Sequence, residues 1–415
     1  MQSTFPRFFI LLLVFITIQS CTKPQASKNQ LISTDILSEY VILDINTTKL
    51  NSEYMQHYYN GMKMAIEEIN SRGGVNGLPL VLKLGNDFGN HLEAYNVAKK
   101  LVAQYNPVVI TGTTNSSTAE GVARYAKDYK IPFVATGTPT ESIIYGVHAS
   151  KYTFRFRDGY NTQVEAIASA IIADTEIKSF TIITYSNNEA KILSAQLKEK
   201  ILQGRKVNFN PDIQVPKNRV VGLDVSDKLY NSISRGVIIM VDHADISSLI
   251  SFLQSTKLLN SRKVYIMLAG EPEWLDSLGA STPNGWITTG YPWYSIKTKA
   301  NIQFANEYIR KYKIKPRYSS YLGYSVVQMI SANLMEGKIY DNTEESRNQF
   351  VRTLHKIAVD TPIGVIEFKS SNISNIGTYV GMLQPYDKEE NVGRKISVIL
   401  DIRMFNSHYC EVKDV

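Results

Sequence analysis

The chain has 415 residues, of which 44% are apolar and 20% are charged, and its formal net charge is +7. This composition is typical of a globular protein and excludes a collagen, a coiled coil and a wholly disordered chain. The length predicts two or three domains of roughly 150 residues, and the mild charge argues against a nucleic-acid partner.

The N-terminus predicts export. An uncharged apolar run, Phe8–Ile18, follows Arg7; it is too short to cross a bilayer but fits a secretory signal peptide. Ile18–Cys21 then resembles a bacterial lipobox, which implies cleavage before Cys21 and a lipid anchor on that cysteine. An ordinary signal peptide with an incidental cysteine is the alternative. We expect a signal peptide at 1–20, a lipidated tether at 21–36, and an extracytoplasmic (periplasmic) location in the bacterial cell envelope.

The chain lacks the motifs of common catalytic and metal sites. Its two cysteines are Cys21 and Cys410, so a lipid on the first excludes an internal disulfide. Its six histidines show no metal-ligand spacing, and no nucleophile elbow, phosphate loop or dinucleotide fingerprint occurs. We expect no cofactor, no metal and no enzymatic activity.

Alternating strands and helices begin near residue 40. Short apolar runs predict strands at 41–45, 80–84, 107–111 and 131–135. Apolar residues three to four apart predict helices at 55–69, 92–102 and 117–129. Strands that alternate with helices of this length imply a parallel sheet with helices on both faces.

The same alternation restarts near residue 180. It predicts strands at 180–185, 206–209, 237–241 and 264–268, with helices at 189–202, 223–234 and ending at 255. Helices at 302–312 and 318–334 precede strands at 365–368, 379–383 and 396–401. The expected fold class is α/β, with two units in series.

Three stretches of the first unit resemble a known family. Gly61–Pro79 is similar to G-x-x-x-A-x-x-x-I-N-x-x-G-G-I-x-G-x-P, Ile110–Thr118 to I-G-x-x-x-S-S-x-T, and Ile131–Val134 to I-P-x-I. These are patterns of the periplasmic binding proteins for leucine, isoleucine and valine. The resemblance extends from about residue 40 to residue 401 and is weak after residue 185.

The resemblance implies a type I periplasmic binding fold, in which two doubly wound parallel-sheet lobes are joined by three crossover segments. The crossings are expected near Arg157, Thr289–Tyr291 and Pro362–Gly364. The N-terminal lobe would comprise residues 37–156 and 291–361, and the C-terminal lobe residues 157–290 and 362–404, followed by a tail at 405–415. A ligand would be enclosed between the lobes by hinge closure.

Polar residues of the first lobe are candidates for ligand binding. Ser117 and Glu120 have the spacing of a capping box, and a helix N-terminus with hydroxyls suits a carboxylate, so Ser116, Ser117 and Thr118 are expected at the ligand. The resemblance adds the loop residues Gly137 and Thr138 and the aromatic Tyr54. The alternatives are a plain cap, a plain turn and an aromatic packed on its own helix.

The second lobe departs from the family where that family places tyrosines. Its candidate ligand residues are Glu189, Asp242 and His243, and either Glu271 or Glu273 as the acid that meets a ligand ammonium. So many acids favour a zwitterionic or cationic ligand. Alternatively, these acids cap helices or face solvent, because Asp and Glu are common in first helical turns.

The expected function is a lipid-anchored solute-binding protein that captures a small amino-acid-like ligand for an ABC importer, with an ABC permease as its partner. The alternative keeps the fold without transport, as a ligand sensor for a signalling partner or as an interaction module in the envelope.

Overall fold

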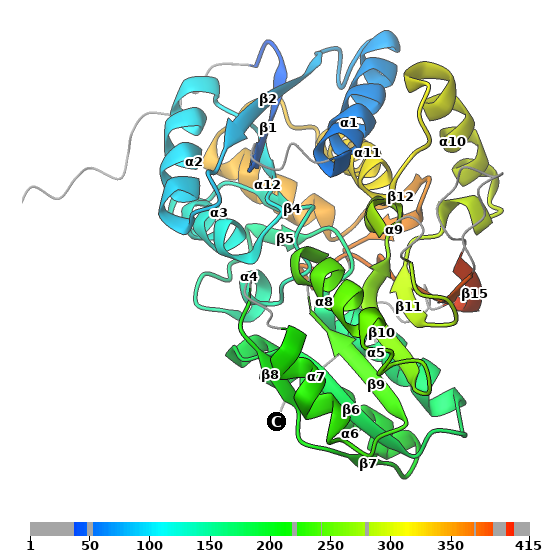
Figure 1. Ribbon diagram of the computed structural model, residues 1–415. Helices are drawn as coiled ribbons and strands as arrows, with labels where there is room; N and C mark the ends of the chain where they lie inside the picture. The colour runs from blue at the N-terminus through cyan, green and yellow to red at the C-terminus, as the bar shows by residue number, and fades with distance from the viewer. Residues whose placement is uncertain are drawn as a thin grey trace, which may run out of the picture.

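The computed structural model describes residues 37–47, 53–217, 222–241, 243–278, 282–368, 371–384 and 396–401. Within these ranges the chain forms two α/β lobes, drawn one above the other in Figure 1. The expected signal peptide, Cys21, the tether and the tail lie outside the described residues. None of the helices in these ranges combines the length and hydropathy that a membrane span requires.

A parallel sheet forms the first lobe, with strands in the order β2-β1-β3-β4-β5. The strands are β1 (Tyr40–Asn46), β2 (Leu80–Asn86), β3 (Val109–Gly112), β4 (Phe133–Ala135) and β5 (Thr153–Arg155). Neighbouring residues of β1 enter different apolar clusters, Ile42 in one and Leu43 in another. The sheet is therefore covered on both faces, as the apolar runs of the sequence predict.

The helices of the first lobe come from two distant parts of the chain. They are α1 (Glu53–Ser71), α2 (His91–Tyr105), α3 (Ser116–Tyr129), the short α4 (Ser142–Tyr145), α10 (Lys299–Tyr312), α11 (Tyr318–Glu336) and α12 (Glu344–Leu354). Helices α1 and α11 approach so closely that a Cβ on Gly61 would lie 2.1 Å from the Ser320 carbonyl oxygen, and one on Gly323 2.2 Å from that of Tyr58. Glycine at both positions allows this backbone contact.

The second lobe contains a larger mixed sheet in the order β15-β14-β11-β10-β9-β6-β7, with β8 also paired to β6. Its strands are β6 (Ser179–Tyr185), β7 (Asn208–Phe209), β8 (Ile213–Val215), β9 (Gly236–Met240), β10 (Lys263–Gly270), β11 (Ile287–Gly290), β14 (Tyr379–Leu383) and β15 (Ile396–Asp401). The pairs β11/β14 and β14/β15 are antiparallel. The two sheets confirm the predicted fold class.

The helices of the second lobe are α5 (Tyr160–Ala173), α6 (Asn188–Gly204), α7 (Gly222–Tyr230), α8 (His243–Ser255) and α9 (Pro272–Leu278). The sequence did not predict α5. This helix is buried over most of its circumference, so it lacks the polar stripe that reveals a surface helix.

Within the described ranges the chain passes between the sheets after β5, after β11 through the 3₁₀ turn η2 (Trp293–Ser295), and before β14. The third passage differs from the expected position. Pro362 and Ile363 form the turn of a hairpin, β12 (Ala358–Thr361) with β13 (Gly364–Glu367). Ile373 still pairs with Arg155 of the first sheet, so the passage lies after Ile373.

Candidate functional site

The strand order of each sheet reverses at one point. In the first sheet β1 lies between β2 and β3, and in the second β6 lies between β7 and β9. Ligands of open α/β sheets bind at the carboxyl ends of the strands beside such a reversal. The loop after β4 touches the first turn of α6, the helix that follows β6, since Thr140 Oγ1 donates to Glu189 Oε1 over 2.7 Å. Carboxyl ends of both sheets therefore meet at the junction of the lobes.

The loop after β3 has strained backbone. Gly112 and Thr113 have φ of 106° and 63°, and a β-branched residue at positive φ costs about 1–3 kcal/mol. The Thr113 amide donates to the Ile45 carbonyl over 2.8 Å, which holds the loop against β1. The adjacent Thr114 hydroxyl is buried without a partner. Stored strain beside an unsatisfied hydroxyl is typical of a functional loop.

The predicted capping box of α3 is wrong. Helix α3 begins at Ser116, and its N-cap is Asn115, whose Oδ1 accepts from the Thr118 amide over 2.8 Å. Ser117 is exposed, and its carbonyl oxygen lies 3.2 Å from Nδ1 of His91. Thr118 is buried and donates its hydroxyl to the Asn115 carbonyl. Asparagine is as good an N-cap as serine, so the motif placed the cap two residues late.

The loop after β4 lies against the loop after β3. A Cβ on Gly137 would lie 2.7 Å from the Thr113 carbonyl oxygen, so glycine permits the contact. The Gly137 carbonyl accepts from Arg157 Nη1 over 3.3 Å. Thr138 is buried, and its hydroxyl oxygen accepts weakly from the Thr140 amide at 3.4 Å. The structure thus brings these two predicted residues to the strained loop and to a buried arginine.

A group of charged and aromatic side chains lies at the same junction; all are buried except Tyr54 and Glu273, which are half-buried. We call it the cleft cluster, and it comprises Tyr54, Arg157, Asp158, Glu271, Glu273, Tyr318 and Ser319. Arg157 Nη2 lies 2.6 Å from Glu271 Oε1 and 3.3 Å from Asp158 Oδ1. Its guanidinium lies over the Tyr318 ring, 5.4 Å from the centroid, and Tyr318 donates to Asp158 over 2.8 Å. Arg157 is only 4% exposed and Glu271 2%, so the pair is screened little by solvent.

Glutamates of the second lobe bind donors of the first. Glu273 Oε1, at the start of α9, accepts from the Ser319 amide in the first turn of α11 over 2.7 Å. A carboxylate at a helix N-terminus is stabilised by the unpaired amides and the helix dipole. Glu189, at the start of α6, accepts from Thr140. These charge-assisted hydrogen bonds connect the lobes.

Burial shifts the pKa values of the cluster. Burial raises the pKa of Asp158, although Arg157 opposes the change. Burial, together with Glu271, raises the pKa of Glu273. Burial alone would lower the pKa of Arg157, but Glu271 and Asp158 hold it well above its usual range. Asp158 and Glu273 therefore keep their protons to higher pH than exposed carboxyls do.

Several buried polar atoms of the cleft cluster lack hydrogen-bond partners. They are Tyr54 Oη, Arg157 Nε, Glu273 Oε2 and Ser319 Oγ. Burial also raises the pKa of Tyr54, which feels the charges of Arg157, Glu271, Glu273 and Asp158. Buried polar atoms are rarely unpaired, so these four mark a place where a polar ligand would gain hydrogen bonds.

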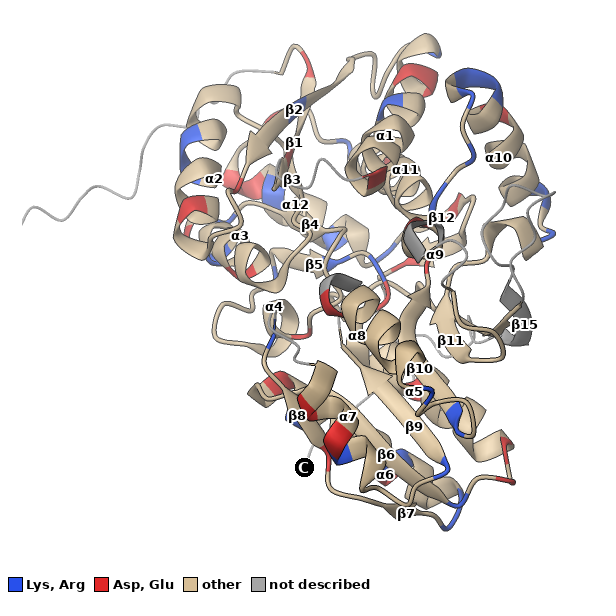
Figure 2. Ribbon diagram, viewed as in Figure 1, with Lys and Arg blue, Asp and Glu red and all other residues tan. Residues whose placement is uncertain are grey.

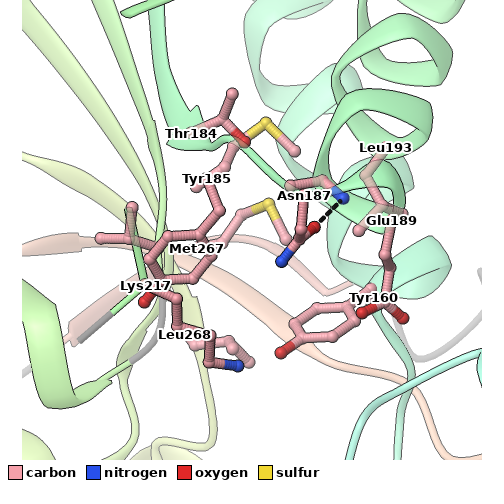
Figure 3. Close-up of a pocket in the computed structure, with 12 residues that line it drawn as sticks. Tyr160, Thr184, Tyr185, Asn187, Glu189, Leu193, Lys217, Met267 and Leu268 are labelled. Carbon is pink, nitrogen blue, oxygen red and sulfur yellow. Dashed lines mark hydrogen bonds between the residues drawn. The ribbon is translucent and has the colours of Figure 1, made fainter. Parts of the chain in front are cut away.

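A small cavity lies in the second lobe at the ends of β6, β9 and β10 (Figure 3). Its volume of about 30 Å³ has room for one or two waters, far below the roughly 300 Å³ of a ligand pocket. Thr184 lines it with an unpartnered hydroxyl, and Glu189 and Tyr160 border it. Leu268, which also lines it, has φ of 62° where β10 shifts register. An amino acid enters only if the lobes separate or side chains move.

The structure places the predicted ligand residues in two groups. Tyr54, Glu271 and Glu273 join the cleft cluster, with Gly137 and Thr138 beside it and Glu189 at the nearby contact with Thr140. Ser117 stays outside on the α3 surface, with Ser116 half-buried. Asp242 and the side chain of His243 lie outside the described residues, although His243 begins α8.

The sequence reasoning did not select Arg157, Asp158, Tyr318 or Thr114 as site residues. The adjacent Arg157 and Asp158 follow the expected crossover strand directly, and this charged pair at a lobe crossing was the available signal. Within the described residues no three His, Cys, Asp or Glu side chains are grouped to hold a metal ion. Acidic and basic segments occur on both lobes and near their junction (Figure 2).

A family model and the related proteins found by sequence comparison indicate the same family. A family model described as periplasmic binding protein matches residues 47–382. Leu/Ile/Val-binding protein homolog 8 of Brucella abortus (strain 2308) is 21% identical over 344 residues, which cover 78% of this chain and 82% of that protein. Homolog 7 of the same strain is 23% identical over 284 residues, covering 66% and 70%.

Solved structures share the fold. A solute binding protein of an ABC transporter from Rhodopseudomonas palustris BisB5, in complex with 3,4-dihydroxy benzoic acid, superposes with a TM-score of 0.73 at 16% identity, covering 87% of this chain and 96% of that one. The leucine binding protein LivK from Thermotoga maritima MSB8 gives a TM-score of 0.70 at 17% identity, covering 86% and 98%. At such identities the likeness establishes the architecture of two lobes and leaves the ligand open.

Proposed function

Because the chain belongs to the periplasmic binding protein family, we propose that it captures a small amino-acid-like ligand between its lobes and delivers it to an ABC permease. The family implies an extracytoplasmic ligand-binding protein. The observation that carries the ligand proposal is the cleft cluster, where four buried polar atoms lack partners between the carboxyl ends of two sheets. The name of the LivK neighbour and the titles of other transporter proteins support this direction.

Capture requires motion of the lobes. The cavity of about 30 Å³ is too small for an amino acid, so the ligand would enter an open form and be enclosed when the lobes close. A ligand shifts this equilibrium only by the difference in its affinity for the two forms. The closed form would be the one that docks on the permease.

The N-terminus supports a membrane anchor. We propose that Cys21 carries lipid and that residues 21–36 tether the lobes to the membrane. Retention in the membrane fraction, lost on Cys21→Ser, tests the anchor. The absence of catalytic motifs supports binding without enzymatic turnover.

A second candidate function is a sensor or interaction module without transport. The observation that favours it is that Glu189 and Glu273 connect the lobes by direct hydrogen bonds to Thr140 and to the Ser319 amide. Such a protein would present a closed surface to a signalling partner.

One experiment separates ligand binding, in import or sensing, from a pure interaction module. The full chain is titrated with the twenty amino acids while its thermal unfolding is followed. Import or sensing predicts that one ligand at a hundred times its Kd stabilises the fold by about 2.7 kcal/mol. A pure interaction module predicts no shift with any of them.

A further inference from the structure

A buried carboxylate lies near the carboxyl end of β1. Asp44 is fully buried, and its strand neighbours Leu43 and Ile45 are apolar. Its oxygens accept four hydrogen bonds from uncharged donors: Asn46 Nδ2 at 2.5 Å, Thr111 Oγ1 at 2.8 Å, Tyr58 Oη at 2.9 Å and Tyr59 Oη at 3.2 Å. The ionised form accepts at all four contacts, whereas a protonated carboxyl must donate at one of them.

This carboxylate is costly to bury, because a charge held only by neutral donors loses its hydration. It lies beside the strained loop after β3. A Cβ on Gly112, which has φ of 106°, would lie 3.0 Å from Asp44 Oδ2. A costly buried charge next to strained backbone is typical of a functional site.

Asp44 is connected to each first-lobe segment that carries predicted ligand residues. Its donor Thr111 lies on β3, just before the strained loop, and its donor Tyr58 lies one turn after Tyr54 on α1. The Tyr58 hydroxyl also lies 2.8 Å from Oγ1 of Thr136, the first residue after β4. Since Tyr58 gives its only hydroxyl hydrogen to Asp44, Thr136 donates to Tyr58. Hydrogen bonds from α1 and from both loops thus end on one carboxylate.

We propose that Asp44 is a positioning residue for ligand binding, whose carboxylate holds α1 and the loops after β3 and β4 in the arrangement that binds the ligand. The inference rests on the proposed function, since these segments carry the predicted ligand residues of the first lobe. Asp44 acts through its donors, because its side chain is fully buried. Loops held in place lose less conformational freedom on binding, so they bind more tightly.

The first test removes the charge of Asp44. Asp44→Asn keeps the size of the side chain and replaces one acceptor oxygen by a donor. Binding to the full chain is measured by calorimetry with leucine, lysine and glutamate, which carry three different net charges. The Kd of each probe that the wild type binds should rise roughly tenfold or more, as when a hydrogen bond to a charged group is lost.

The matched control is Arg347→Lys, at the opposite end of the same sheet. Arg347 is buried, and its Nε donates to Asn342 Oδ1 over 3.0 Å. Asn342 in turn donates to the carbonyl of Pro107, ahead of β3. This variant should lower the free energy of unfolding and leave every Kd unchanged. A loss of affinity equal to that of Asp44→Asn would mean that affinity follows stability alone, and it would overturn the proposal.

Hydrogen–deuterium exchange tests the positioning without any probe. Asp44→Asn should accelerate exchange in residues 111–118 and 136–140. Tyr58→Phe keeps the carboxylate and breaks its link to Thr136, so it should accelerate exchange in residues 136–140 alone, and it keeps the test decisive where Asp44→Asn does not fold. Arg347→Lys should act on residues 342–354 instead. Acceleration spread evenly over the lobe, or no acceleration, overturns the inference.

A pH profile separates the charge of Asp44 from its shape. Burial raises the pKa of Asp44, and the hydrogen bonds from Thr111 and Tyr58 oppose the rise. The titratable groups that face it are Tyr58 and Tyr59, and burial raises the pKa of each of these too. As pH falls through the pKa of Asp44, the wild type acquires a neutral carboxyl that resembles the asparagine. The Kd of Asp44→Asn divided by that of the wild type should therefore fall towards one, and a ratio that stays constant contradicts a role for the charge.

The outcomes distinguish this inference from the proposed function. A probe that binds the wild type and Asp44→Asn equally well overturns the inference and leaves the proposed function intact. If the wild type binds none of the twenty amino acids, the proposed function fails, even where exchange shows that Asp44 holds the loops.

Discussion

The two lobes differ in the chemistry that they present where they meet. The first lobe offers hydrogen-bond donors, the Thr140 hydroxyl and the Ser319 amide, whereas the second offers the carboxylates of Glu189 and Glu273. Arg157, on the segment between them, adds a guanidinium to Glu271. In both of these hydrogen bonds between the lobes, the first lobe supplies the donor and the second lobe supplies the carboxylate acceptor. If the proposed function holds, we expect the second lobe to select the charge of the ligand and the first lobe to fix its position.

The faces also differ in construction. The first-lobe rim is shaped by backbone, with Thr113 at positive φ and Gly137 against it. The acids of the second lobe project from the first turns of α6 and α9 or, like Glu271, from the residue just before α9. Side chains on helix ends can be exchanged without rebuilding a sheet, whereas a strained loop cannot. Ligand preference should therefore change more easily through the second lobe.

The largest expected loss of folding stability comes from removing Arg157, the buried cation between the two lobes. Arg157→Ala leaves Glu271 and Asp158 buried without their partner, and breaking such a pair costs about 3–5 kcal/mol. Urea unfolding measures the loss. The control Arg310→Ala removes an exposed ion pair with Glu307 and should leave the free energy of unfolding unchanged. Equal stability of both variants would show that Arg157 does not hold the faces together.

A smaller loss of folding stability should distinguish Asn115, the N-cap of α3, from the nearby Ser117. Asn115→Ala removes the side-chain acceptor of the Thr118 amide and should destabilise the fold by about 1 kcal/mol. Ser117→Ala, on the exposed side of the same turn, should cost almost nothing. Denaturant midpoints of the two variants give the comparison. The reverse order would restore Ser117 as the cap.

The smallest effect is a pH dependence of the acidic face. The pKa of Glu273 is raised above 4.5 in the folded chain, so the folded state holds this proton more tightly than the unfolded state. Its contribution to the free energy of unfolding is therefore lost as pH rises from 4.5 through the folded pKa. The groups facing it are Glu271, Tyr54 and Ser319.

The measurement is urea unfolding of the wild type and Glu273→Gln at successive pH values. The stability of the wild type relative to the variant should fall as pH rises. If the free energies of unfolding of the wild type and the variant change with pH in parallel, the Glu273 carboxyl has the same pKa in the folded and unfolded chain.

The sequence predicted the fold well because its signals are local. The apolar run at residues 237–241 overlaps the fully buried strand β9 (Gly236–Met240), and the apolar spacing of residues 55–69 lies within α1. Helix α5 was not predicted because it is buried on most sides, so its sequence lacks the alternation of apolar and polar residues that indicates a surface helix. The position of the third crossing escaped because the pairing of Ile373 with Arg155 joins residues 218 positions apart.

The site was predictable only in part for the same reason. Motif and position placed the loop of Gly137 and Thr138 and the acids Glu271 and Glu273 near the junction of the lobes, and their role in ligand binding stays a prediction. The role of Arg157 depends on Glu271, 114 residues later, and no local pattern encodes that partnership. The cap of α3 was misplaced because asparagine and serine satisfy an amide equally well.

The backbone contact between α1 and α11 has a mechanical consequence. Gly61 and Gly323 leave no layer of side chains between these helices, so one cannot slide or rotate without the other. Tyr54 lies in the first turn of α1 and Ser319 in the first turn of α11, so these two residues must move together as one rigid unit. A ligand that contacts either residue therefore acts on both helices of the first lobe at once. Motion between the lobes must then come from the segments that pass between the two sheets.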